Sequence, residues 1–76
     1  LLNIDVQRRK RFEEIPAVIR KIRAAEKAIG PAGRVLVRYS GTENIARVMI
    51  EGENQKQIEA LARDIADEIV RQIGAA

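Results

Sequence analysis

A short polar segment between two apolar stretches carries the side chains best suited to binding an anion. Arg38 ends one alternating stretch and Arg47 lies early in the next. Ser40 and Thr42 lie between them and add hydroxyl donors, while Gly41 has no side chain that would keep a ligand away from backbone N–H groups. Planar guanidinium groups match phosphate oxygens in pairs. The spacing therefore predicts a phosphate site made of two arginines, two hydroxyls and exposed amides.

The same segment has a simpler interpretation. Serine, glycine, threonine and asparagine are ordinary turn residues, and arginine is common on the solvent face of a strand. Composition alone therefore favours a plain turn over an anion site.

The elements that must position these residues follow from the apolar pattern. Apolar residues alternate with polar ones over residues 2–7. Every second residue is apolar over residues 35–39 and, from Ala46 onward, over residues 45–50. These patterns predict three strands. Helical spacing predicts a first helix over residues 12–29, with Glu13, Glu14 and Pro16 in its first turn and Gly30 at its end. A second helix begins after the cap Asn54 and ends at Gly74.

The order of these elements, β-α-β-β-α, predicts an α+β fold in which two helices pack on one face of a small antiparallel sheet. We expect one domain over residues 1–76, a possible fourth short strand in an irregular segment, and a frayed tail at Ala75 and Ala76. The polar face of the second helix is predicted to face solvent and to carry no site. Its charged residues are Arg63, Asp64, Asp67, Glu68 and Arg71.

Composition excludes several classes of chemistry. The chain has no cysteine and no histidine, so a disulfide, a thiolate metal site, a Ser–His triad and zinc chemistry are excluded. The net charge of +3 permits an anionic partner. No apolar stretch is long enough to span a membrane and no signal peptide is visible. The chain begins at Leu1, not Met, so we expect it to be a piece of a longer protein.

The polar segment and its flanks resemble a known family. Residues 33–44 read GRVLVRYSGTEN, and residues 47–52 read RVMIEG. This is similar to the C-terminal domain of the phosphohexomutases, which carry an Arg-x-Ser-Gly-Thr-Glu loop followed by a second arginine. The RVMIE continuation resembles phosphoglucosamine mutases more than phosphomannomutases. Residues 12–16 and the final helix also resemble the corresponding parts of this domain, so the resemblance covers nearly the whole chain.

The resemblance implies a role for each residue of the segment. The enzymes of this family have four domains: the first carries a phosphorylated serine, the second binds magnesium, the third reads the sugar, and the fourth grips the phosphate that is not reacting. By resemblance, this chain is the fourth domain, and its phosphate ligands are Arg38, Ser40, Gly41, Thr42 and Arg47. Ionised Glu43 cannot bind phosphate directly, so we expect it to orient an arginine or to cap the turn.

The resemblance also implies the function of the parent enzyme. It would be a cytoplasmic isomerase that interconverts glucosamine 6-phosphate and glucosamine 1-phosphate for cell-wall amino-sugar synthesis, with magnesium as its cofactor. The fragment itself is expected to hold no cofactor, no metal and no catalytic residue. Its expected partners are a hexosamine phosphate and the other domains of the parent chain. A phosphomannomutase or phosphoglucomutase is the alternative parent.

Two other interpretations remain open at this point. Residues 30–33 spell the Gly-x-x-Gly of RNA-binding KH domains, and residues 8–11 form a basic run with no match in the family. However, the Gly-x-x-Gly follows a predicted helix and precedes a predicted strand, and the chain's only aromatic residues are Phe12 and Tyr39. Both features disfavour nucleic-acid binding. The second interpretation is a domain that serves only in packing between domains or subunits.

Overall fold

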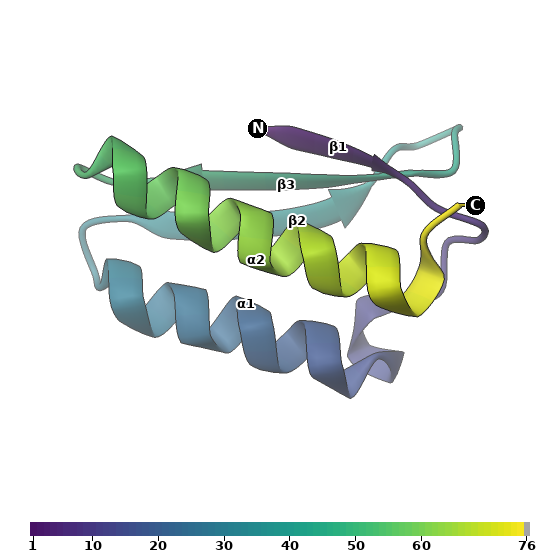
Figure 1. Cartoon of the computed structure of the whole chain (residues 1–76), viewed down its shortest axis with the longest axis horizontal. Helices are drawn as coiled ribbons and strands as arrows, with labels where there is room; N and C mark the ends of the chain where they lie inside the picture. Colours follow the sequence, from purple (N-terminus) through teal and green to yellow (C-terminus); the bar gives the residue numbers. More distant parts are fainter. Residues whose placement is uncertain (76) are drawn as a thin grey trace.

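A computed structural model describes residues 1–75 of the chain. The sheet has three strands and is accompanied by two α-helices. Figure 1 shows the strands on one side of the molecule and the helices on the other. The elements in chain order are β1 (Leu2–Asp5), a 3-10 turn η1 (Phe12–Glu14), α1 (Pro16–Ile29), β2 (Arg34–Tyr39), β3 (Ile45–Glu51) and α2 (Gln55–Ile73). No helix in this part of the chain combines the length and the apolar character needed to cross a membrane.

The sheet has the strand order β1-β3-β2, and both neighbours of β3 run antiparallel to it. The strands β1 and β2 therefore run parallel to each other with β3 between them, and α1 connects them. Both helices cover the same face of the sheet and run antiparallel to each other (Figure 1). The predicted α+β fold, its element order and its single helical layer are confirmed.

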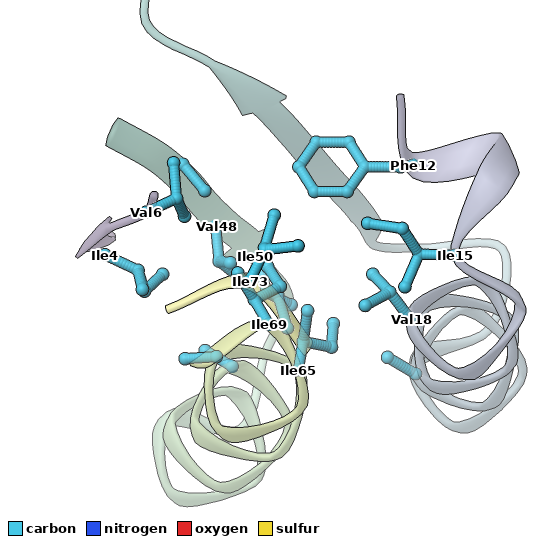
Figure 2. Packing of buried hydrophobic residues seen from close by; sticks show 14 residues of the cluster. Ile4, Val6, Phe12, Ile15, Val18, Val48, Ile50, Ile65, Ile69 and Ile73 are labelled. Carbon is cyan, nitrogen blue, oxygen red and sulfur yellow. The ribbon is translucent and has the colours of Figure 1, made fainter. Parts of the chain in front are cut away.

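The core lies between the sheet and the helices. Alternate residues of β3, namely Ala46, Val48 and Ile50, are buried because successive side chains of a strand point to opposite faces. They meet apolar residues from both helices, among which Val18, Ile65 and Ile69 have no exposed surface (Figure 2). These contacts hold β3, and with it one side of the polar segment, on a rigid layer.

The first helix differs from the prediction at its start. Residues 12–14 form a separate 3-10 turn, and α1 begins only at Pro16. Ile15 has φ −122° and ψ 82°, outside the helical region, because the proline ring disfavours a helical conformation in the residue before it. Glu13 and Glu14 therefore lie outside the first turn of α1. The end of the helix is as predicted: Gly30 adopts φ +78° and its N–H donates to the carbonyl of Glu26.

The connection between α1 and β2 bears on the nucleic-acid alternative. Residues 30–33, with the Gly-x-x-Gly spacing, join a helix to a strand. A KH domain needs this segment between two helices. The nucleic-acid interpretation therefore loses the motif that favoured it.

The two ends of the described chain are joined by a short antiparallel pairing. Val6 and Gly74 form an isolated bridge, the N–H of Gln7 donates to the carbonyl of Ile73, and the N–H of Ala75 donates to the carbonyl of Asp5. This pairing takes the place of the fourth strand that was expected. The prediction of a frayed tail is wrong for Ala75, since its amide is bonded, and Ala76 lies outside the described residues.

One residue of the predicted solvated face of α2 is buried. Glu68 is only 5% exposed, and its carboxylate accepts hydrogen bonds from Arg71 Nη1 at 2.8 Å and from Gln72 Nε2 at 2.9 Å. It follows the buried Ile65 by three residues, so it lies on the flank of the apolar face. The two donors compensate the carboxylate for its loss of water.

Candidate anion site

The two arginines of the predicted site lie directly opposite each other. In the antiparallel pairing of β2 with β3, Arg38 is the partner of Arg47. Both are exposed, and both alternate with residues that face the helices, so they lie on the open face of the sheet. Side chains opposite each other in such a pair have Cβ atoms about 4.5–5.5 Å apart, and like charges at this distance repel each other. The structure thus places two cations side by side on one face.

The next arginine on the same strand provides a comparison. Arg34 is the partner of Glu51 in the register, and the two form an ion pair with Arg34 Nε 2.5 Å from Glu51 Oε1. Within residues 1–75, by contrast, no carboxylate lies within 4.0 Å of Arg38 or Arg47. That includes the carboxylate of Glu43, which was expected either to orient one of them or to cap the turn. No carboxylate of residues 1–75 therefore neutralises the positive charge of the pair.

The loop between these strands, residues 40–44, is held by its first side chain. Ser40 Oγ accepts long hydrogen bonds from the N–H groups of Thr42, at 3.4 Å, and Glu43, at 3.3 Å. The N–H of Ser40 itself donates to the carbonyl of Ile45 and closes the hairpin. The serine hydroxyl therefore occupies the acceptor position in front of two amides that were expected to face a ligand. Bonds this long are near the weak limit, so a phosphate oxygen competes well for the same donors.

Space beside Gly41 is open. A Cβ atom placed on this glycine would meet nothing within 4 Å, and its φ is not in the left-handed region. Neither packing nor backbone conformation therefore requires a glycine here. The missing side chain leaves the peptide groups of the loop accessible from outside, as a bound anion would need.

A hollow on the open face of the sheet includes both arginines. It measures about 270 Å³ and is lined by Leu1, Leu36, Arg38, Arg47 and Met49. On the side of β3 away from β2, Arg47 pairs with Asn3 of β1, so an amide side chain lies next to the two arginines across the sheet. A larger hollow, about 470 Å³, lies between the start of β1 and α2 and contains none of the predicted site residues. The charge of the paired arginines makes the smaller hollow the better candidate for an anion.

Sequence reasoning left the basic run, residues 8–11, without a role, and the structure brings it to the loop. Arg9 Nη1 donates to the carbonyl of Ser40 and to that of Gly41, each at 3.0 Å. Asn44 Nδ2 donates to the carbonyl of Gln7 at 3.3 Å. The register of β1 with β3 pairs Asp5 with Ile45, so the chain leaving β1 passes beside the loop. Only the strand order reveals this neighbourhood, and no local motif in the sequence signals it.

Tyr39 joins the same basic run to the covered face of the sheet. Its ring stacks on Phe12 with centroids 4.3 Å apart and an angle of 11° between the planes. Its hydroxyl donates to the carbonyl of Lys10. Burial raises the pKa of the Tyr39 hydroxyl, the positive charge of Arg8 opposes this shift, and the negative charge of Glu13 adds to it. These contacts fix the end of β2, where Arg38 is located.

The described residues hold no cluster of three or more histidine, cysteine, aspartate or glutamate side chains that could bind a metal ion. The paired arginines and the loop amides supply hydrogen-bond donors and fixed positive charge, which are the groups that suit an anion.

The chain is similar to known proteins over nearly its whole length. Residues 1–68 match the family model described as phosphoglucomutase/phosphomannomutase, C-terminal domain. Similar proteins include the phosphoglucosamine mutases of Solibacter usitatus (53% identity), Chlamydia pneumoniae (46%) and Anaeromyxobacter sp. strain Fw109-5 (49%), each over 97% of this chain. The chain spans only 16–17% of the length of these relatives.

Proposed function

The chain belongs to the phosphoglucomutase/phosphomannomutase family, as its C-terminal domain, and from this premise we propose that it binds the non-reacting phosphate of a hexosamine phosphate. The parent in this proposal is a phosphoglucosamine mutase, an isomerase that interconverts glucosamine 6-phosphate and glucosamine 1-phosphate. The branch is favoured by the similar proteins that carry this name. A phosphomannomutase or phosphoglucomutase is the alternative.

The observation that carries the proposal is the unneutralised arginine pair. Arg38 and Arg47 face each other across two strands without a carboxylate within 4.0 Å in residues 1–75, whereas the neighbouring Arg34 is paired with Glu51. A phosphate dianion between two guanidinium groups removes their repulsion and gains charge-assisted hydrogen bonds from both. The same arrangement gives no such benefit to a neutral sugar hydroxyl.

The remaining residues of the proposed site complete the phosphate shell. Gly41 exposes the loop's peptide groups, and the hydroxyls of Ser40 and Thr42 are additional donors. Glu43 supports the turn through its N–H, which donates to Ser40 Oγ. A site that recognises phosphate and not ring hydroxyls accepts a bisphosphorylated sugar in either orientation. A mutase needs this property because its bisphosphorylated intermediate must turn around between the two half-reactions.

The rest of the reaction is assigned to other domains of the proposed parent. The phosphorylated serine, the magnesium ion that neutralises charge on the transferring phosphoryl group, and the sugar-reading loop all lie outside this chain in the proposal. The clamp contributes by holding the substrate in line, and positioning accounts for much of phosphoryl-transfer catalysis. A cytoplasmic location follows from the same proposal. The isolated chain is therefore expected to give background rates with glucosamine 6-phosphate, magnesium and the bisphosphate activator.

A phosphate titration followed by NMR tests the binding role. We expect inorganic phosphate and glucosamine 6-phosphate to shift the amides of Gly41, Thr42 and Glu43 most, with affinity near millimolar, about −4 kcal/mol, because the other half of the cleft is absent. Arg38→Ala and Arg47→Ala each lose a charged contact worth about 1.5–3 kcal/mol, so each should weaken binding at least tenfold.

The matched control is Arg63→Ala, which removes an equally exposed charge from α2. Arg38→Lys keeps the charge without the planar pair of donors and should recover only part of the affinity. Equal weakening by Arg63→Ala would show that net charge alone attracts the anion. Shifts confined to residues outside the hairpin would refute the proposed site.

A further inference from the structure

The basic run is the one motif of the sequence that the proposed function leaves unused. It contacts the 40–44 loop through a side chain that binds the loop's backbone. Arg9 donates from a single nitrogen, Nη1, to two successive backbone carbonyls, those of Ser40 and Gly41, at 3.0 Å each. Residues 9 and 41 are 32 positions apart in the sequence. The contact is therefore a tertiary one that ties the start of the loop to the segment after β1.

The orientation of a carbonyl determines the orientation of the N–H in the same peptide unit. All peptide bonds in the described chain are trans, and in a trans peptide the C=O and N–H point in opposite directions. The peptide of the Ser40 carbonyl carries the N–H of Gly41, and the peptide of the Gly41 carbonyl carries the N–H of Thr42. When Arg9 holds both carbonyls, both N–H groups must point away from it.

The hydrogen bonds of the loop agree with this orientation. The N–H of Thr42 points to Ser40 Oγ, at 3.4 Å, on the side that Arg9 does not occupy. A guanidinium bound to a carbonyl also polarises its peptide, which makes the opposite N–H a stronger donor. Arg9 further keeps two negative carbonyl dipoles from facing an approaching anion.

We propose that Arg9 is a positioning residue of the anion site: it holds the Ser40 and Gly41 carbonyls so that the Gly41 and Thr42 amides face the phosphate. This inference rests on the proposed function for the identity of the ligand. In this proposal Arg9 acts through the two carbonyls that its Nη1 binds, and not as a ligand of the phosphate.

Arg8 supplies a matched control. It is the neighbouring residue, it is equally charged and exposed, and no side-chain hydrogen bond to the loop is present for it in residues 1–75. Arg9→Gln and Arg8→Gln therefore remove the same charge from nearly the same place. Only Arg9→Gln removes the two carbonyl contacts.

The test measures both the free loop and phosphate binding. In the free chain, Arg9→Gln should move the amide resonances of Gly41 and Thr42 and lower their heteronuclear NOE, while Arg8→Gln should not. With inorganic phosphate, Arg9→Gln should weaken binding about tenfold, as expected for lost charge-assisted contacts, and Arg8→Gln less than about twofold. The difference should persist at 0.5 M salt, where long-range charge is screened.

Arg9→Lys retains the charge and a donor on a shorter side chain, so it should restore the Gly41 and Thr42 resonances and the affinity in part. Circular dichroism and thermal melts verify that each variant is folded. Unchanged loop amides in both free Arg9 variants would overturn the inference, whatever the affinity. Equal weakening by Arg8→Gln and Arg9→Gln would also overturn it. A wild-type chain in which phosphate shifts no loop amide would instead refute the proposed function, and the free-chain spectra would still decide whether Arg9 orients the loop.

Discussion

The two faces of the β2–β3 hairpin are built from alternate residues of the same strands and have opposite properties. On the covered face, Val37, Tyr39, Ala46 and Val48 pack against the helices or the segment before α1. On the open face, Leu36, Arg38, Arg47 and Met49 line a hollow. Because the side-chain period of a strand is two, one residue can serve stability while its neighbour serves binding. If the proposed function is correct, the hairpin separates the two tasks at the level of single positions.

The open face also differs along its own length. At one end Arg34 and Glu51 neutralise each other, and at the other end Arg38 and Arg47 do not. A sheet that needed only solubility would gain from pairing opposite charges at both positions. The unpaired end lies next to the 40–44 loop, so the cost in repulsion is concentrated where an anion is expected to bind.

The largest expected loss of stability concerns the core that packs on the covered face. Ile65 has no exposed surface and packs in the shared core, so Ile65→Ala should lower the free energy of unfolding by about 2–5 kcal/mol. Val70→Ala on the same helix, where the side chain is 52% exposed, should change it by less than about 0.5 kcal/mol. Urea unfolding followed by circular dichroism measures both. Similar losses at the two positions would mean that the helix faces are assigned wrongly.

A second prediction concerns Glu68, the one charged residue of 1–75 that is buried. Glu68→Ala removes two hydrogen bonds and some packing, while the exposed donors of Arg71 and Gln72 regain water, so it should cost about 0.5–1.5 kcal/mol of stability. Asp67→Ala removes the same charge from an exposed neighbour and should be nearly neutral. If both variants are neutral in thermal unfolding, the buried carboxylate and its two hydrogen bonds add nothing to stability, and the contrast between the faces is weaker than proposed.

Tyr39 offers a third test, because it links the covered face to the basic run. Tyr39→Phe keeps the stacking on Phe12 and removes the bond to the Lys10 carbonyl, so it should cost about 0.5–1.5 kcal/mol. The tyrosine pKa is raised above its ordinary 10.0 in the folded chain. The folded state therefore keeps a proton that the unfolded state loses, and stability falls as pH rises above that value.

Tyr39→Phe should lack this alkaline loss. Tyr39 is the only tyrosine in the chain, so its absorbance near 295 nm follows its titration directly. A folded-state titration at or below the ordinary value would contradict the predicted slope.

The smallest effect is expected on the open face. Arg38→Ala and Arg47→Ala each relieve a like-charge contact, so each should leave stability within about 0.5 kcal/mol or raise it slightly. Arg34→Ala, which breaks an exposed ion pair, should lower it by about 0.2–1 kcal/mol. Chemical unfolding at low salt resolves the difference in sign. A clear loss of stability on removing Arg38 or Arg47 would show that the pair supports the fold and is not reserved for a ligand.

The sequence predicted most of the fold because its elements depend on local periodicity. The three strands, the second helix and the end of the first were recognisable from apolar spacing, capping residues and glycine. The start of the first helix was misplaced because the effect of Pro16 on Ile15 competed with an apolar pattern that continues through it. Glu68 was misplaced because its charge suggested exposure, although its spacing from Ile65 put it beside the core.

For the candidate site, the sequence by itself determined which donors are present and that a hairpin brings Arg38 and Arg47 together. These are properties of neighbouring residues, and short-range backbone geometry decides them. The tertiary structure alone decided that β3 lies between β1 and β2, and therefore that Arg9 reaches the Ser40 and Gly41 carbonyls. Contacts between residues so far apart depend on how the strands are ordered when the core is buried, and no local pattern records that order.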